Sequence, residues 1–128
     1  MRKITQAILN LNLFQPLRVE PMQPNPSLAH MDWEEPDRIV LYEDEDVSFC
    51  IDIKFSDPES VNVYLLEVTR LDLHHGDVYD SENIWEIEGA EEDLIQFVKS
   101  IAWIISDSHL LKSKNIYTAA NSGHGKIQ

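Results

Sequence analysis

The chain has 128 residues, of which 43% are apolar and 26% charged, and this composition fits one globular domain over residues 1–128. Its single cysteine, Cys50, excludes an internal disulfide, and no zinc-ligand spacing surrounds it. No signal-peptide pattern is seen, and no segment approaches the roughly 18 apolar residues of a membrane span. We therefore expect a soluble, cytoplasmic protein.

Charge is the strongest compositional signal. The net charge is −13, and residues 32–93 hold 21 of the 23 acids but only three of the ten lysines and arginines. Such a segment would repel nucleic acid and anionic membranes, whose binding depends on basic residues. It would attract a basic protein and steer its approach. We expect a basic protein partner, no direct nucleic-acid binding and no membrane binding.

The N-terminal third predicts a helix followed by an irregular segment. Residues 3–14 carry apolar side chains at the spacing of one helix face, and Pro16 ends the pattern. Residues 15–37 hold five prolines and no glycine, which favours an extended connection. This Pro-rich connection either wraps the domain or hangs free, and its scattered apolar residues favour wrapping.

Residues 38–88 predict an antiparallel sheet. In residues 47–55, VSFCIDIKF, apolar and polar side chains alternate with period two, the pattern of a half-buried strand. Further strands are expected at 38–42, 61–73 and 84–88. The alternation slips near Leu65 and Leu66, and either a β-bulge or burial on both faces would explain the slip.

Residues 90–106 predict a second helix, whose apolar side chains cover most of its circumference. Such a helix needs burial on a sheet or against another chain. Residues 115–128 are expected to form a flexible tail. Sequential strands with short turns favour antiparallel pairing. The predicted fold is α+β: a single antiparallel four- to five-stranded β-meander packed by an N-terminal and a C-terminal helix.

The stretch LHHGDVYDSEN, residues 73–83, is expected to be the longest connection of the meander. Its candidate metal ligands are His74, His75 and Asp77. Neighbouring histidines in a strand point to opposite faces, and the spacing fits no calcium loop. Turn chemistry is simpler, because Gly76 supplies positive φ and aspartate tolerates turns. We expect a surface or partner-contact loop, with no metal and no cofactor.

Catalytic motifs are not found. The first glycine is Gly76, so there is no glycine-rich phosphate loop before it, and no Gly-x-Ser-x-Gly motif occurs. The strand carboxylates Asp52, Glu67 and Glu86 are expected on a solvent face, whereas acid–base catalysis needs a carboxyl group in an apolar pocket. The pattern leans against an enzyme.

Two acidic clusters, at residues 43–46 and 77–82, are the candidate partner-binding surface. Trp33, ringed by acids in MDWEEP, is a further candidate anchor, whereas Trp85 and Trp103 are expected in the core. The partner-binding candidates are Glu43, Asp44, Glu45, Asp46, Asp77, Asp80, Glu82 and Trp33. The alternative is that these charges serve solubility and keep sheet edges from aggregating.

Three hypotheses on function follow. The first is a small acidic protein-binding module, an inhibitor or immunity-type protein that occludes a basic surface on a nuclease or another nucleic-acid-binding protein. Immunity proteins and nucleic-acid mimics share this general profile, but no motif connects the chain to a family. The second is a homodimeric chaperone or assembly factor that uses the apolar C-terminal helix. The third is a small metal-dependent hydrolase.

Overall fold

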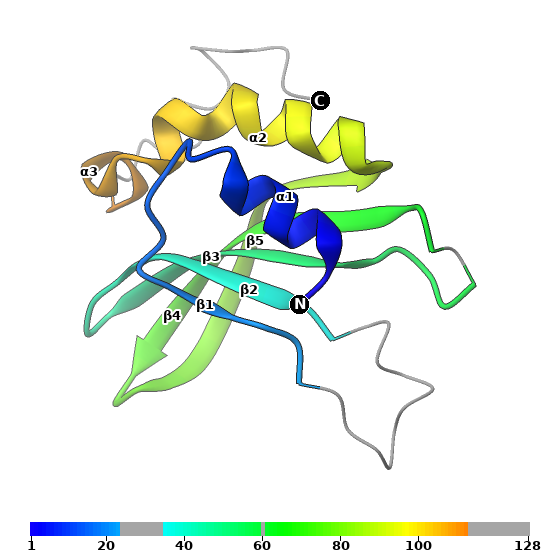
Figure 1. Ribbon diagram of the computed structural model, residues 1–128. Helices are drawn as coiled ribbons and strands as arrows, with labels where there is room; N and C mark the ends of the chain where they lie inside the picture. Colours follow the sequence, from blue (N-terminus) through cyan, green and yellow to red (C-terminus); the bar gives the residue numbers. More distant parts are fainter. Residues whose placement is uncertain (24–34, 60, 113–128) are drawn as a thin grey trace.

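The structure is a computed structural model that describes residues 1–23, 35–59 and 61–112. Its elements are α1 (Lys3–Asn10), β1 (Arg18–Glu20), β2 (Asp37–Glu43), β3 (Val47–Phe55), β4 (Tyr64–His74), β5 (Asp77–Gly89), α2 (Glu91–Ile105) and α3 (Ser108–Lys112). The strands form one sheet in the order β1-β2-β3-β4-β5, and every neighbouring pair is antiparallel. The predicted α+β fold is confirmed, with helices from the two ends of the described chain packed on the sheet (Figure 1).

The core lies between one face of the sheet and the helices α1 and α2 (Figure 1). Alternate residues of a strand point to opposite faces, so one face of the sheet supplies the core. The core residues are Ile4, Ile8, Ile39, Ile51, Ile53, Leu66, Val68, Leu94, Phe97, Val98, Ile101 and Ile105. Burying each such side chain stabilises the fold by about 1.5–3 kcal/mol. We call the opposite face, turned away from α1 and α2, the open face.

Helix α2 begins where a carboxylate caps its first turn. Asp93 Oδ2 accepts a hydrogen bond of 3.0 Å from the backbone N–H of Ala90. Gly89 makes room for this cap, because a Cβ on it would lie 2.6 Å from Asp93 Oδ2. The apolar spacing of the sequence then places Leu94, Phe97 and other residues on the sheet. The helix predicted at residues 90–106 matches α2 to within one residue at each end.

Helix α1 is shorter than the predicted helix at residues 3–14. It ends at Asn10, and the backbone of Asn12 has a positive φ of 55°. Asparagine is one of the few residues that adopt this left-handed conformation readily, and it ends helices for that reason. The helix therefore stops well before Pro16, which we had expected to end it.

The Pro-rich connection contains a strand that the sequence pattern did not predict. β1 pairs with β2 over three residues, with Val19 opposite Ile39. Part of the segment at residues 15–37 is thus the first strand of the sheet, which gives the five strands at the upper end of the predicted range. Residues 24–34 of this connection, on which the predicted wrapping depends, lie outside the described residues, and so does the tail predicted at 115–128.

The third predicted strand, at residues 61–73, corresponds to β4, but β4 has no bulge at the position where one would explain the slip in alternation. The register between β3 and β4 is continuous from Tyr64 to Asp72, so no bulge lies at Leu65 or Leu66. Leu66 is buried in the core, and Leu65 is half-buried on the open face. Burial on both faces, the other explanation, accounts for the slip in alternation.

The last strand differs most from the prediction. The expected long connection at residues 73–83 is a two-residue turn, His75–Gly76, followed by β5, which runs from Asp77 to Gly89 rather than over 84–88 alone. The register against β4 shifts at Tyr79 and at Ile84, each an extra residue on β5. These two bulges and the long hairpin replace the predicted loop.

A buried ion pair joins α1 to the sheet and was not anticipated. Asp37 Oδ2 accepts hydrogen bonds from the backbone N–H of Arg2 (2.8 Å) and from Thr5 Oγ1 (2.6 Å), while Asp37 Oδ1 accepts one from the N–H of Met22 (2.8 Å). Arg2 Nη1 lies 3.8 Å from Asp37 Oδ2 and donates to the carbonyl of Ile53. Burial lowers the pKa of Arg2, and the charge of Asp37 opposes that change.

The tryptophans do not all meet in the core. Trp85 is half-buried against it, whereas Trp103 on α2 is 39% exposed, so the expectation is wrong for Trp103. Trp33 lies outside the described residues. Among the described helices, none has the length and apolar character needed to cross a membrane.

Candidate functional site

Two hairpin ends lie side by side at one end of the sheet. In a meander, alternate turns fall at the same end, so the β2–β3 turn and the β4–β5 turn are neighbours. The backbone N–H of Leu73 donates to the carbonyl of Asp46 at 2.9 Å and joins the two hairpins. Between them lies a pocket of about 680 Å³, lined by Arg18, Glu43–Asp46 and Leu73–Gly76.

The β2–β3 tip, residues Asp44–Asp46, is folded by one of its own acids. Asp44 Oδ1 accepts hydrogen bonds from the N–H groups of Asp46 (2.8 Å) and Val47 (3.0 Å), and Tyr42 donates its hydroxyl to Asp44 Oδ2 (2.8 Å). This is the local turn chemistry of aspartate. Asp44, a predicted partner-binding residue, therefore has a structural role, while Glu45 and Asp46 stay exposed.

Glu43 is also engaged within the chain. Arg18 of β1 donates from Nη1 to Glu43 Oε2 (2.7 Å) and from Nη2 to Glu43 Oε1 (3.0 Å), and its Nε donates to Glu20 Oε2 (2.7 Å). Two parallel bonds of this kind are the favoured geometry for arginine and carboxylate. The hydrogen bonds from Arg18 lower the pKa of Glu43, and in return raise the pKa of Arg18.

The histidine pair forms the turn of the β4–β5 hairpin. His75 (φ 53°) and Gly76 (φ 84°) are both left-handed, as the two central residues of a type I′ turn must be. The rings of His74 and His75 are tilted with centroids 4.2 Å apart, and Tyr79 meets His74 edge-on at 6.4 Å. In the described residues no group of three or more His, Cys, Asp or Glu side chains could hold a metal ion, so His74, His75 and Asp77 do not form a metal site.

The far half of this hairpin projects from the molecule. We define the arm as residues 74–83, all of which are exposed. Figure 1 shows the β4–β5 hairpin extending beyond the other strands, away from α1 and α2. The arm carries Asp77, Asp80 and Glu82, three of the predicted partner-binding acids, and no lysine or arginine. Apolar side chains are exposed beside them: Val78 at 53% and Tyr79 at 69%.

Five of the seven predicted acids have no lysine or arginine partner among the described residues. Within the described part of the chain, Glu45, Asp46, Asp77, Asp80 and Glu82 form no ion pair with lysine or arginine. Arg70 lies opposite Glu82 in the ladder, but its Nε bonds Asp72 Oδ1 at 3.0 Å instead. The structure thus gathers these five exposed carboxylates at one end of the sheet.

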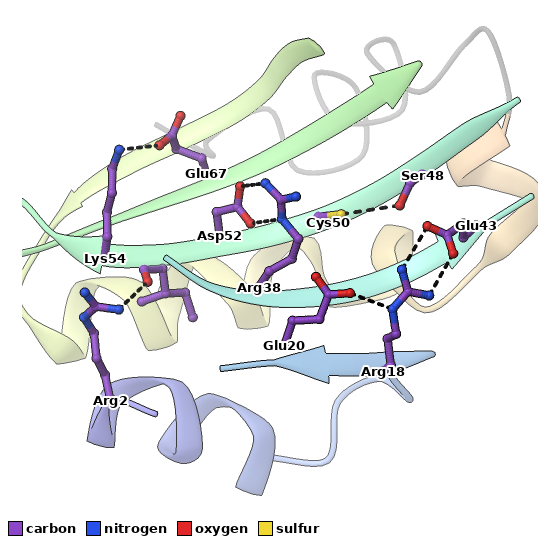
Figure 2. Close-up of polar contacts among 11 residues, drawn as sticks. Arg2, Arg18, Glu20, Arg38, Glu43, Ser48, Cys50, Asp52, Lys54 and Glu67 are labelled. Atoms are coloured by element: carbon purple, nitrogen blue, oxygen red, sulfur yellow. Dashed lines mark hydrogen bonds and ion pairs between the residues drawn. The ribbon is translucent and has the colours of Figure 1, made fainter. Parts of the chain in front are cut away.

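The open face carries charges that compensate one another, as Figure 2 shows. Arg38 Nε and Nη2 donate to the two oxygens of Asp52 at 2.8 and 2.9 Å, and this pair raises the pKa of Arg38. Lys54 Nζ lies 3.7 Å from Glu67. Asn83 bridges the like-charged neighbours Glu67 and Glu86 by donating to both. Two of these three carboxylates thus face a cation, while Glu86 is bonded by an uncharged amide and keeps its charge.

Cys50 lies in the middle of the open face and is fully buried. Its Sγ is 3.5 Å from Ser48 Oγ, and Val40 and Leu71 pack around it. Burial raises the pKa of the thiol to about 11, and the contact with Ser48 only partly opposes this. At neutral pH the group is a thiol, which is a poor nucleophile.

The sequence missed Arg18, Arg38 and Asp37 as organising residues. The alternating Arg-Val-Glu at residues 18–20 is the available signal for a short strand. It does not show the contact with Glu43, because β1 places Arg18 opposite Val40 and the long side chains make the contact. Predicted anchor Trp33 lies outside the described residues.

Comparison with protein-family models, with curated proteins and with solved structures finds no match. The function is therefore argued from the geometry of the chain itself.

Proposed function

We propose that the chain is a small protein-binding module that occludes a basic surface of a partner protein, as an inhibitor or immunity-type protein does. The observation that carries the proposal is the group of five exposed acids at one end of the sheet, none of them neutralised by a lysine or arginine of the described chain. Opposite charges on two proteins steer their encounter and select partners by sign. Nucleases and other nucleic-acid-binding proteins have basic surfaces of this kind, because they must neutralise phosphates.

The distribution of compensating pairs supports this assignment. Arg38 and Lys54 lie on the open face with their acidic partners, and Arg18 is held by Glu20 and Glu43. Within the described chain, exposed acids without a lysine or arginine partner lie on the arm and the β2–β3 tip, and others lie near the opposite end of the sheet at Glu59, Glu91 and Glu92. The acids of the arm and the β2–β3 tip differ from those at the opposite end in lying on neighbouring hairpins, which the hydrogen bond from Leu73 to Asp46 joins.

The homodimer hypothesis has one observation in its favour, the 39% exposure of Trp103 on α2. The other large apolar residues of this helix, apart from the half-buried Ile95, are buried against the sheet, α1 and α3, so they need no second chain to cover them. The buried residues of α2 are Leu94, Phe97, Val98, Ile101, Ile104 and Ile105. We keep the binding module as the proposal.

A pair of matched charge variants tests the proposal. The arm variant, Asp77→Asn/Asp80→Asn/Glu82→Gln, removes three charges from the arm. The control variant, Glu59→Gln/Glu91→Gln/Glu92→Gln, removes three exposed charges near the opposite end of the sheet. Proteins that the wild-type chain captures from a lysate at low salt, and releases at high salt, are purified and titrated individually against the three forms.

We expect the arm variant to weaken binding about tenfold or more, mainly through slower association, because lost charges reduce steering. The control variant should change the affinity by less than about twofold. Equal losses in both variants would show that net charge alone attracts the partner, and would count against this surface. A captured protein that binds the arm variant as tightly as the wild type would contradict the proposal directly.

A further inference from the structure

The two edges of the sheet differ in length and in charge. β1, at one edge, has three residues, lies between Pro16 and Pro21, and its Arg18 is engaged by Glu20 and Glu43. Short strands and prolines are common ways to close an edge to other chains. β5, at the other edge, has 13 residues, and no further strand of the described chain pairs with it. The β5 edge thus has backbone N–H and C=O groups that no strand of the described chain satisfies, and of these the N–H of Ser81 donates to Asp80 Oδ1 at 2.9 Å.

Only the inner half of β5 is covered. Ile84, Trp85 and Ile87 are half-buried towards the core, whereas residues 77–83 are exposed without exception. Figure 1 shows that α2 lies over the other end of the hairpin, so the helix leaves the arm free. A strand added at residues 77–83 would meet no helix.

The β4–β5 ladder is regular over only part of residues 77–83, and this limits how many residues of an added strand can pair without interruption. Between the bulges at Tyr79 and Ile84, the residues Asp80–Asn83 pair regularly with β4. Val78 and Tyr79 stand exposed at the outer end of this stretch and provide apolar surface for side chains of an added strand. Strand addition takes its affinity from backbone hydrogen bonds and its specificity from such side-chain contacts.

The charges on β5 favour a different protein, rather than a second copy of this chain, as the source of the added strand. All five charged residues of β5 are acids, and none is a lysine or arginine. Two β5 strands side by side would bring like charges together, which destabilises a strand pair. A strand with lysine or arginine on it would instead form favourable cross-strand pairs with Asp80 and Glu82.

We propose that the outer edge of β5, at residues 77–83, accepts an extended, positively charged segment of a partner protein as an additional strand. This inference rests on the proposed function and adds the mode of binding. Acids and bulges also guard sheet edges against aggregation. If the acids and bulges of β5 serve only to prevent aggregation, no strand adds to β5, so binding of a peptide as a strand distinguishes the two explanations.

The test uses two synthetic peptides of equal charge with the full-length chain. The first alternates lysine and valine over seven residues, with blocked ends. The second replaces each valine with proline, which keeps the charge, removes the backbone N–H of every second residue and disfavours the strand conformation. Binding is followed by NMR, from the amide shifts and from hydrogen exchange of residues 77–83, for the wild type, the arm variant and the control variant.

We expect the lysine–valine peptide to bind about tenfold tighter than the proline peptide, and to slow exchange of amides in residues 77–83. The arm variant should weaken this binding, and the control variant should not. Equal binding of both peptides would overturn strand addition while leaving the charge-based proposed function intact. No binding of the lysine–valine peptide, or shifts confined to other strands, would overturn the inference as well.

The proposed function fails by a different result, namely a purified partner whose affinity is unaffected by the arm variant. The peptide experiment and the partner titration therefore separate the failure of the binding mode from the failure of the binding surface.

Discussion

Asp37 is a buried carboxylate, and both of its oxygens accept hydrogen bonds. Its side chain is 0% exposed, and it accepts hydrogen bonds from α1 and from the segment after β1 while facing Arg2. Taking a charge out of water costs several kcal/mol, which only a cation and hydrogen bonds in good geometry offset. One residue thus holds together three segments that are distant in sequence.

We predict that Asp37→Ala lowers the free energy of unfolding by about 3–5 kcal/mol, because it leaves the guanidinium of Arg2 buried without its carboxylate. Urea unfolding followed by circular dichroism measures the change. The exposed control Glu59→Gln should stay within about 0.5 kcal/mol of the wild type. A loss of less than about 1 kcal/mol for Asp37→Ala would show that water or another group replaces the carboxylate.

Cys50 gives a prediction at alkaline pH. Its pKa is about 11 in the folded chain against an ordinary value of 9.0. Between these two values the unfolded chain has lost the thiol proton and the native chain has kept it, so stability falls as pH rises from 9 to 11 and is fully present below 9. Cys50→Ala should show a shallower decline over this range. Parallel pH profiles of unfolding free energy for the two forms would contradict the assignment.

The elements that the sequence predicted well are those with one buried face. β3 matches its predicted range at both ends, because the face covered by helices carries only apolar side chains and the other carries Ser48, Cys50, Asp52 and Lys54. The sequence predicts a loop for the outer half of β5, since all its residues are exposed and no alternation marks it as a strand. β1 was missed because a three-residue strand is too short to show a period. The acidic residues were found from composition, but their meeting at one end depends on the turns of the meander.

The β4–β5 turn can be tested by substitution at its two left-handed residues. A Cβ on Gly76 would meet no atom within 4 Å, so the cost of Gly76→Ala is only the strain of its φ of 84°. We expect a loss of about 1–2 kcal/mol. His75→Asn should stabilise the chain by about 0.5 kcal/mol, because asparagine followed by glycine favours this turn. Thermal unfolding measures both; a destabilising His75→Asn would mean that the contacts of the His75 ring outweigh its backbone strain.

At the scale of the molecule, the excess of negative charge costs some stability. The net charge is −13, and Asp80 lies directly opposite Asp72 across the β4–β5 ladder. Like charges placed this way repel, and added salt screens them. The acids of the arm are therefore expected to contribute nothing favourable to folding.

We predict that the arm variant unfolds at the same temperature as the wild type or a few degrees higher, a difference of about 0–1 kcal/mol. Raising the salt concentration should stabilise the wild type more than the arm variant. Melting curves at low and high salt measure both effects. An arm variant less stable than the wild type by more than about 1 kcal/mol would show that these acids hold the arm in place.

The order of the sheet has a consequence for folding kinetics. From β2 to β5 each strand pairs with the next one along the chain, across connections of at most eight residues. Short loops cost little entropy to close, whereas the contact of Arg2 with Asp37 spans 35 residues. We expect the hairpins to form before α1 docks on them, so that Asp37→Ala speeds unfolding and leaves the folding rate near that of the wild type. Stopped-flow measurements of both rates test this order, and slower folding of the variant would place the docking of α1 in the transition state.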